Sequence, residues 1–157
     1  MYLSENHDRQ RALDVVRASS SLPFVSKIVE VDGIPMLDGG IADSIPVQHA
    51  IDMGWQHNVV VLTRNKGWRD MGKDHKIPYL YKNYPRLRVA LSHRHRAYNE
   101  QIQLVDDLEA AGKITCIRPI RPLEVGRIEK DTDKLERLYE EGFMLGEAFC
   151  EKCVEKE

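Results

Sequence analysis

A chain of 157 residues, 42% hydrophobic and 31% charged, is long enough to bury the core of one domain and too apolar for intrinsic disorder. The net charge of −2 argues against a general nucleic-acid binder, and no apolar run approaches the roughly 18 residues that cross a bilayer. Because the N-terminus has no signal-peptide pattern and three cysteines suit a reducing compartment, we expect a cytoplasmic protein.

The N-terminal third predicts a helix followed by a hairpin. Residues 5–18 have a partial apolar face, and the serines that follow end this helix. Residues 27–31 and 34–37 form two short strands. Between them, Asp32 and Gly33 tolerate the positive φ angles of a tight turn.

The next segments predict an α/β unit. A helix begins at Pro46, whose missing N–H costs nothing in the first turn, and ends at Gly54. The β-branched run at residues 58–64 is typical of a strand buried on both faces of a parallel sheet. A polar, glycine-bearing loop follows it.

A long helix over residues 86–111 is predicted next, ended by Gly112. Residues 113–120 form a further strand. The last helix begins near Asp133, which caps it while Glu136 reaches back from the third position.

Two features of the last helix predict that it is packed. One is an apolar stripe expected to be buried, namely Leu135, Leu138, Tyr139, Leu145 and Phe149. The other is the pair Gly142 and Gly146, each costing roughly 1 kcal/mol relative to alanine. Glycines at that cost indicate a close approach to another element.

The most informative motif is Asp38-Gly39-Gly40, which follows the second strand of the hairpin. An aspartate there can accept a proton from a hydroxyl nucleophile within roughly 2.6–3.2 Å, and α/β sheets bind ligands just beyond the carboxyl ends of strands. The alternative is a turn in which Asp38 merely accepts backbone N–H bonds. The motif alone leaves both roles open.

The context of the motif carries a family resemblance. An alanine- and serine-rich segment leads into Leu22-Pro23, the D-G-G follows, and a proline-started helix and the "VVVL" strand complete the order. In this order, the segment from Arg17 to Arg64 resembles the patatin-like phospholipase family. Residues 79–147 resemble the C-terminal extension of a bacterial subset of that family.

The resemblance implies a fold and a division of the chain. Residues 1–70 would be the C-terminal part of a patatin-like catalytic core, which is a three-layer α/β/α domain. Residues 71–157 would be a mostly helical C-terminal α/β extension.

The resemblance also implies a lipid acyl hydrolase with a Ser-Asp dyad and no cofactor. Asp38 would be the dyad aspartate, supported by the backbone of Gly39 and Gly40, and the substrate would be a lipid or another ester. The chain departs from the family in having no G-x-S-x-G elbow for the nucleophile, and in reading Asp43-Ser44 where the family often has asparagine. The serine is therefore expected on a missing N-terminal half, and this chain alone is expected to be inactive.

A competing hypothesis is a truncated, non-catalytic homologue that binds a protein or lipid. Since a half-domain would expose the apolar edge of its sheet, a homo-oligomer is also expected. No nucleic-acid partner is expected.

Basic residues supply two further hypotheses. Arg64, Lys66 and Arg69 follow the predicted buried strand and could meet a phosphate headgroup at a membrane surface, or could form a plain surface loop. The run "SHRHR", which holds Arg94 and Arg96, is either a solvated helix face or a second contact with anionic headgroups.

No metal site is predicted. His93 and His95 are two residues apart and point to different helix faces. Cys150 and Cys153 have the spacing of half a zinc or redox motif, but no second pair exists in the sequence. The hydroxyls of the Ser19–Ser21 run lack a strained strand-to-helix elbow, so we expect them to end a helix rather than act as nucleophiles.

Overall fold

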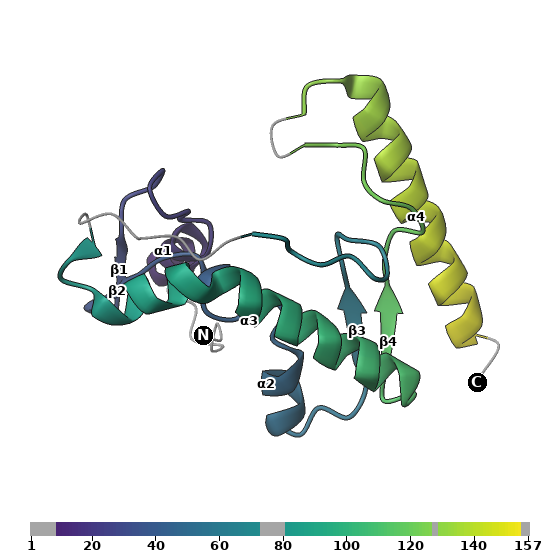
Figure 1. Ribbon diagram of the computed structural model, residues 1–157, viewed down its shortest axis with the longest axis horizontal. Helices are drawn as coiled ribbons and strands as arrows, with labels where there is room; N and C mark the ends of the chain where they lie inside the picture. Colours follow the sequence, from purple (N-terminus) through teal and green to yellow (C-terminus); the bar gives the residue numbers. More distant parts are fainter. Residues whose placement is uncertain (1–8, 73–80, 127–128, 155–157) are drawn as a thin grey trace. The chain divides into compact units, whose positions relative to one another are not determined.

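The computed structural model describes residues 9–72, 81–126 and 129–154 (Figure 1). The predicted mixed α/β class is confirmed, with long helices and small sheets. The chain divides into two compact units, Met1–Ile45 with Gly72–Tyr98 and Pro46–Met71 with Asn99–Glu157. Residues 5–8 of the first predicted helix lie outside the described ranges.

The first unit contains the predicted helix and hairpin. Helix α1 (Arg9–Ser19) contacts strand β1 (Val29–Val31), which pairs antiparallel with β2 (Ile34–Met36). Asp32 and Gly33 have φ angles of 53° and 75°, as the two-residue turn requires. Arg11 donates two hydrogen bonds from Nε and one from Nη2 to the Asp32 carboxylate at 2.9–3.1 Å, which ties the helix to the turn.

A small core holds this unit together. Its buried apolar residues are Ala18, Val31, Ile41, Ile45 and Tyr81. The hydroxyl of Tyr81 accepts a hydrogen bond from the backbone N–H of Phe24 at 3.0 Å, and the two rings lie 5.3 Å apart. Phe24 has a φ of 67°, which is uncommon for a residue with a side chain, so the Tyr81 contact stabilises a strained backbone.

The second unit contains a parallel strand pair. Helix α2 (Val47–Asp52) contacts β3 (Asn58–Val61), and β3 pairs in parallel with β4 (Ile114–Ile117). The expectation that this strand is buried on both faces is wrong, because Val59 is 50% exposed and Val61 is 72% exposed. In the described chain only alternate side chains of β3 face the core. The valines between them lie on the opposite face of the strand pair, which is exposed.

The long helix is confirmed as α3 (Pro85–Ala110), and Gly112, with a φ of 67°, follows its end. The residues of α3 up to Tyr98 belong to the first unit and those from Asn99 to the second. The buried apolar residues of the second unit are Val47, Leu62, Ile102, Val105 and Ile114.

The last helix, α4 (Thr132–Val154), differs from expectation at its N-terminus. Asp131, not Asp133, caps it, because Asp131 Oδ1 accepts hydrogen bonds from the N–H groups of Asp133 and Lys134 at 3.1 and 3.3 Å. The predicted cap was placed two residues too late because several acidic residues precede the apolar stripe.

The packing predicted for α4 is also wrong. No α4 side chain that the structure describes is buried, and Tyr139, from the predicted buried stripe, is 71% exposed. A Cβ added at Gly142 or Gly146 would meet no atom within 4 Å, so nothing packs closely there among the described residues. Helix α4 contacts β4, and the carboxylate of Glu141 accepts a hydrogen bond from the Ile120 N–H. Among the described residues, several apolar side chains of α4 remain exposed.

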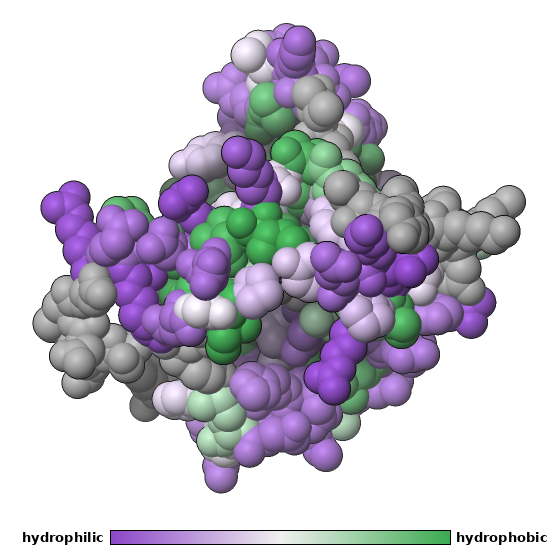
Figure 2. Space-filling model, turned by 90° about the vertical axis from the view of Figure 1, so that its left-hand side faces the viewer, coloured by the Kyte–Doolittle hydropathy of each residue, from purple (hydrophilic) through white to green (hydrophobic). Residues whose placement is uncertain are grey.

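Apolar residues also lie on the surface. On the face drawn in Figure 2, apolar residues gather into a patch among hydrophilic ones. Among the described residues, no helix combines the length and hydropathy needed to traverse a lipid bilayer.

Candidate functional site

The D-G-G motif begins a tightly wound loop, residues 38–45, which we call the D-G-G loop. Asp38 lies at the N-terminus of the short 3-10 helix η1 (Gly39–Ile41), two residues after β2. Its backbone N–H donates to the carbonyl of Ser21 at 2.9 Å, and its own carbonyl accepts from Ile41 N–H at 3.2 Å. The backbone of Asp38 is therefore fixed on both sides.

Gly40 connects the two parts of this loop. Its N–H donates to Asp38 Oδ1 at 2.7 Å, and its carbonyl accepts from the Ser44 hydroxyl at 2.6 Å and from Arg94 Nε at 3.1 Å. A Cβ at this position would lie 3.1 Å from Asp38 Oδ1, tighter than most Cβ contacts. Glycine is therefore the residue that lets the Asp38 carboxylate approach the backbone.

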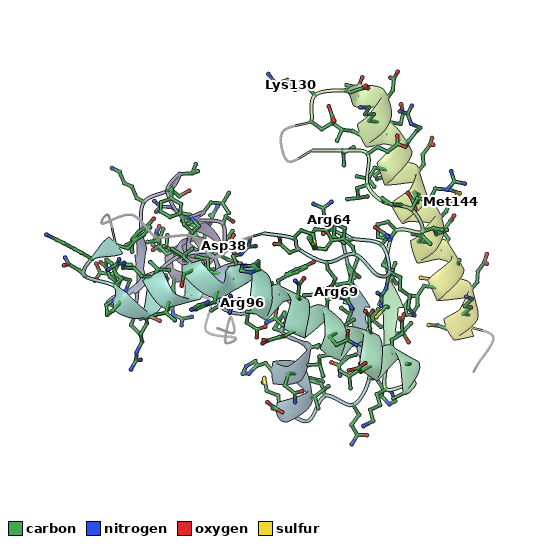
Figure 3. The ribbon with its side chains drawn as sticks, in the orientation of Figure 1. Asp38, Arg64, Arg69, Arg96, Lys130 and Met144 are labelled. Atoms are coloured by element: carbon green, nitrogen blue, oxygen red, sulfur yellow. The ribbon has the colours of Figure 1, made fainter. Side chains whose placement is uncertain are left out.

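The Asp38 carboxylate is half-buried and only partly engaged (Figure 3). Within the described part of the chain, Oδ1 is bound to Gly40 N–H, and Oδ2 has no hydrogen-bond partner. A carboxylate held by one oxygen keeps the other available to accept a proton. The geometry is compatible with a general base and equally with the turn role that the sequence left open.

The serine hydroxyls near this loop are occupied. Ser20 Oγ donates to the carbonyl of Val16 at 2.9 Å, and Ser21 Oγ donates to that of Arg17 at 2.7 Å. These bonds lie at the end of α1, so the prediction that the serines end a helix is confirmed. Among the described residues, no serine hydroxyl is hydrogen-bonded to Asp38.

The predicted headgroup contacts lie on the loop after β3, residues 64–69, which we call the basic loop. Lys66 pairs with Glu109 at 3.2 Å, and Arg69 bonds Asp106 and Gln103 at 3.0 Å each. The Arg64 guanidinium lies 4.9 Å from the centre of the Trp68 ring, a cation–π contact. An anionic headgroup would have to compete with carboxylates at Lys66 and Arg69, but not at Arg64.

Sequence reasoning missed the residue at the centre of these ion pairs. Arg118 directly follows β4, and its side chain is only 9% exposed. It donates to Asp106 at 2.9 Å and to Glu109 at 2.8 Å. Burial opposes ionisation of Asp106, but hydrogen bonds from Arg118 and Arg69 and their charges outweigh it, so the pKa of Asp106 lies below its ordinary value. This cluster has the character of a structural network, since each of its three cations is bound to at least one of the two carboxylates.

Arg94 has a partner that the sequence did not indicate. The sequence suggested a solvated face or a headgroup contact, whereas the structure places its Nε on the Gly40 carbonyl in the D-G-G loop. No local pattern identifies this partner, because the two residues are 54 positions apart.

No metal or cofactor site emerges from the residues that the structure describes, since no three potential metal-ligating side chains cluster among them. Cys150 and Cys153 are exposed free thiols. Cys116 is partly buried near Arg118, and burial raises the pKa of its thiol.

Comparison with known proteins bears on the D-G-G loop. Residues 3–51 match the family model for patatin-like phospholipases. The predicted resemblance is thus confirmed for the N-terminal part of the chain, which includes Asp38-Gly39-Gly40 and ends before β3. Residues 84–155 match a second family model, described as a domain of unknown function (DUF6363).

A curated relative matches the chain over both regions. The chain is 29% identical over 151 residues to the uncharacterized protein YjjU of Escherichia coli (strain K12), covering 90% of this chain. The match spans 41% of the length of that relative. No solved structure matches the chain.

Proposed function

We propose that this chain contributes the aspartate of a Ser-Asp dyad to a patatin-like lipid acyl hydrolase, with Asp38 as that aspartate. The serine nucleophile would come from a polypeptide segment outside these 157 residues. The observation that carries the proposal is a D-G-G loop, inside the region matched to patatin-like phospholipases, that holds Asp38 by one carboxylate oxygen and leaves the other without a partner among the described residues.

In the proposed reaction, Oδ2 of Asp38 accepts the proton of the serine hydroxyl as its oxygen attacks the ester carbonyl carbon. Backbone amides of the segment that carries the serine stabilise the negative oxygen of the tetrahedral intermediate. Collapse of the intermediate expels the alcohol, which takes up the proton. The same carboxylate then activates water to release the acyl group as a carboxylic acid.

The role of Gly39 and Gly40 in this proposal is to shape the loop. Gly40 N–H fixes the orientation of the Asp38 carboxylate, and the absence of a Cβ permits their 2.7 Å contact. Of the three basic-loop residues predicted to meet a headgroup, Arg64 is the best candidate, because Lys66 and Arg69 already have acidic partners.

The test begins with the genomic reading frame upstream of the Met1 codon and uses the polypeptide that the frame encodes. With p-nitrophenyl butyrate and a phospholipid as substrates, Asp38→Asn is expected to lower kcat by at least about 100-fold, as loss of a general base does. The matched control is Asp52→Asn, an exposed aspartate on α2 that should leave kcat unchanged.

Two outcomes would overturn the proposal. Retained turnover in Asp38→Asn would show that Asp38 is not the general base. A stop codon immediately upstream in the reading frame would mean that no preceding segment supplies the serine. The chain would then be better explained as a non-catalytic homologue that binds a protein or lipid. The exposed face of β3, which includes Val59 and Val61, offers apolar area for such binding.

A further inference from the structure

The D-G-G loop is shaped by hydrogen bonds that converge on the backbone of one residue, Gly40. The Gly40 N–H orients Asp38, and the Gly40 carbonyl accepts from both Ser44 and Arg94. A carbonyl oxygen has two lone pairs, so these two donors use its full capacity. Because the N–H and the carbonyl of Gly40 are joined through its Cα, a movement of the held carbonyl would also move the N–H that orients the Asp38 carboxylate.

One of these donors comes from the other matched region of the chain. Arg94 lies on α3, within the residues that match the domain of unknown function, whereas Gly40 lies within the patatin-like match. Both residues belong to the first compact unit. Arg94 is half-buried, and among the described residues no carboxylate pairs with it. The Gly40 carbonyl that it binds is neutral, which indicates a role other than charge neutralisation.

A residue that lies just before this matched region supports Asp38 from a second side. Tyr81, just before α3, is buried and accepts a hydrogen bond from Phe24 N–H, which fixes the left-handed backbone there. Three residues before Phe24, the Ser21 carbonyl accepts the Asp38 N–H. Tyr81 and Arg94 therefore reach the two backbone segments that set the position of Asp38.

We propose that Arg94 is a positioning residue, through which α3 of the C-terminal region holds the D-G-G loop in the conformation that presents Asp38. The catalytic consequence rests on the proposed function of Asp38. In this chain the domain of unknown function would thus have a specific role. Its Arg94 would complete the hydrogen bonding of the D-G-G loop, which lies in the patatin-like region.

The first test uses this chain alone and does not depend on catalysis. In Arg94→Ala, the backbone amide of Gly40 is expected to exchange with deuterium about tenfold faster by NMR, because loss of one donor loosens the Gly40 peptide. Exchange at Val105, which is fully buried in the second unit, should be unchanged. The control is Arg88→Ala, which removes an exposed arginine from the same helix.

The second test uses the longer polypeptide that carries the serine. Arg94→Ala is expected to lower kcat about tenfold with KM unchanged, and millimolar methylguanidinium should restore part of the loss. Arg94→Lys should retain intermediate activity, because an ammonium can donate one hydrogen bond but lacks the fixed fork of a guanidinium. If Arg94→Ala does not fold, kcat and KM of Arg94→Lys and Arg94→Gln are compared with those of the wild type instead.

The outcomes separate this inference from the proposed function. A raised KM with unchanged kcat would make Arg94 a substrate-binding residue and overturn the positioning role, as would a Gly40 amide that exchanges at the wild-type rate. If Asp38→Asn retains turnover, the proposed function fails, while the exchange measurement still decides whether Arg94 holds the loop.

Discussion

The D-G-G loop and the basic loop both follow a strand, and both were predicted to reach a substrate, but they use their charges differently. Asp38 is held by one hydrogen bond to a backbone amide, and its second oxygen has no partner in the described chain. Lys66 and Arg69 are bound to Glu109 and Asp106, which Arg118 binds as well. One loop keeps a reactive atom available, whereas the other neutralises its charges.

This difference shows that the kind of residue in a loop does not determine its role. Lys66 and Arg69 became structural because α3 supplies Asp106 and Glu109, about 40 positions away in sequence. Asp38 differs because its carboxylate binds a backbone N–H, that of Gly40, through Oδ1 alone. If the basic loop is structural and only the Asp38 carboxylate is lightly held, substitutions in the two regions should differ in their effects.

The largest effect is expected at Arg118. Arg118→Met removes the cation that binds both carboxylates and leaves Asp106 with Arg69 alone and Glu109 with Lys66 alone, which should lower the free energy of unfolding by about 2 kcal/mol. Urea unfolding at pH 7 measures the loss. The control is Lys66→Met, whose side chain is 69% exposed and should cost no more than about 1 kcal/mol. Equal losses in the two variants would contradict a network centred on Arg118.

A pH dependence is expected at Asp106. Its pKa is lowered in the folded chain, so its contribution to stability is present above its ordinary value of 3.8 and is lost as the pH falls through the folded pKa. Unfolding free energies measured from pH 6 to pH 3 should therefore fall less steeply in Asp106→Asn than in the wild type. Parallel curves would show that Asp106 titrates normally.

A smaller effect is expected within the D-G-G motif. Gly40→Ala places a Cβ 3.1 Å from Asp38 Oδ1 and should weaken their hydrogen bond, at a cost of about 1 kcal/mol in unfolding free energy. Gly39→Ala is the matched control, because its Cβ would meet no atom within 4 Å. If both variants unfold at the same urea concentration, the close approach of Asp38 to Gly40 is not maintained in solution.

The cysteines provide the mildest test, which leaves the fold intact. Burial raises the pKa of the Cys116 thiol, whereas Cys150 and Cys153 are exposed. Ellman's reagent at pH 8 should therefore modify two thiols rapidly and one slowly, and Cys116→Ser should remove the slow phase. Three equal rates would indicate that the surroundings of Arg118 open readily.

Local chemistry explains what the sequence predicted. The Asp32-Gly33 turn, the helix that ends at Gly112 and the parallel strand pair follow from residue types acting on their own backbone. The errors arise where a distant interaction partner determines the burial or the role of a residue. The uncovered faces of α4 depend on what packs against them, and the roles of Arg94 and Arg118 depend on residues that only the fold brings near.

The D-G-G motif shows the same limit for the candidate site. Its sequence left open a proton-acceptor role and a purely local turn role for Asp38, and the hydrogen bond from Gly40 to Asp38 is compatible with both. The donors that secure the Gly40 carbonyl could not be predicted, because Ser44 and Arg94 carry no pattern that points to position 40.

The pairing of β3 with β4 has a consequence for synthesis of the chain on the ribosome. Asn58 and Ile114, the first paired residues, are 56 positions apart, whereas the β1–β2 hairpin closes through a two-residue turn. At about 5–20 residues per second, roughly 3–11 seconds separate the emergence of the two parallel strands. During that interval the "NVVV" segment lacks β4, the strand it pairs with among the described residues, so slow translation between them would lengthen its exposure to aggregation.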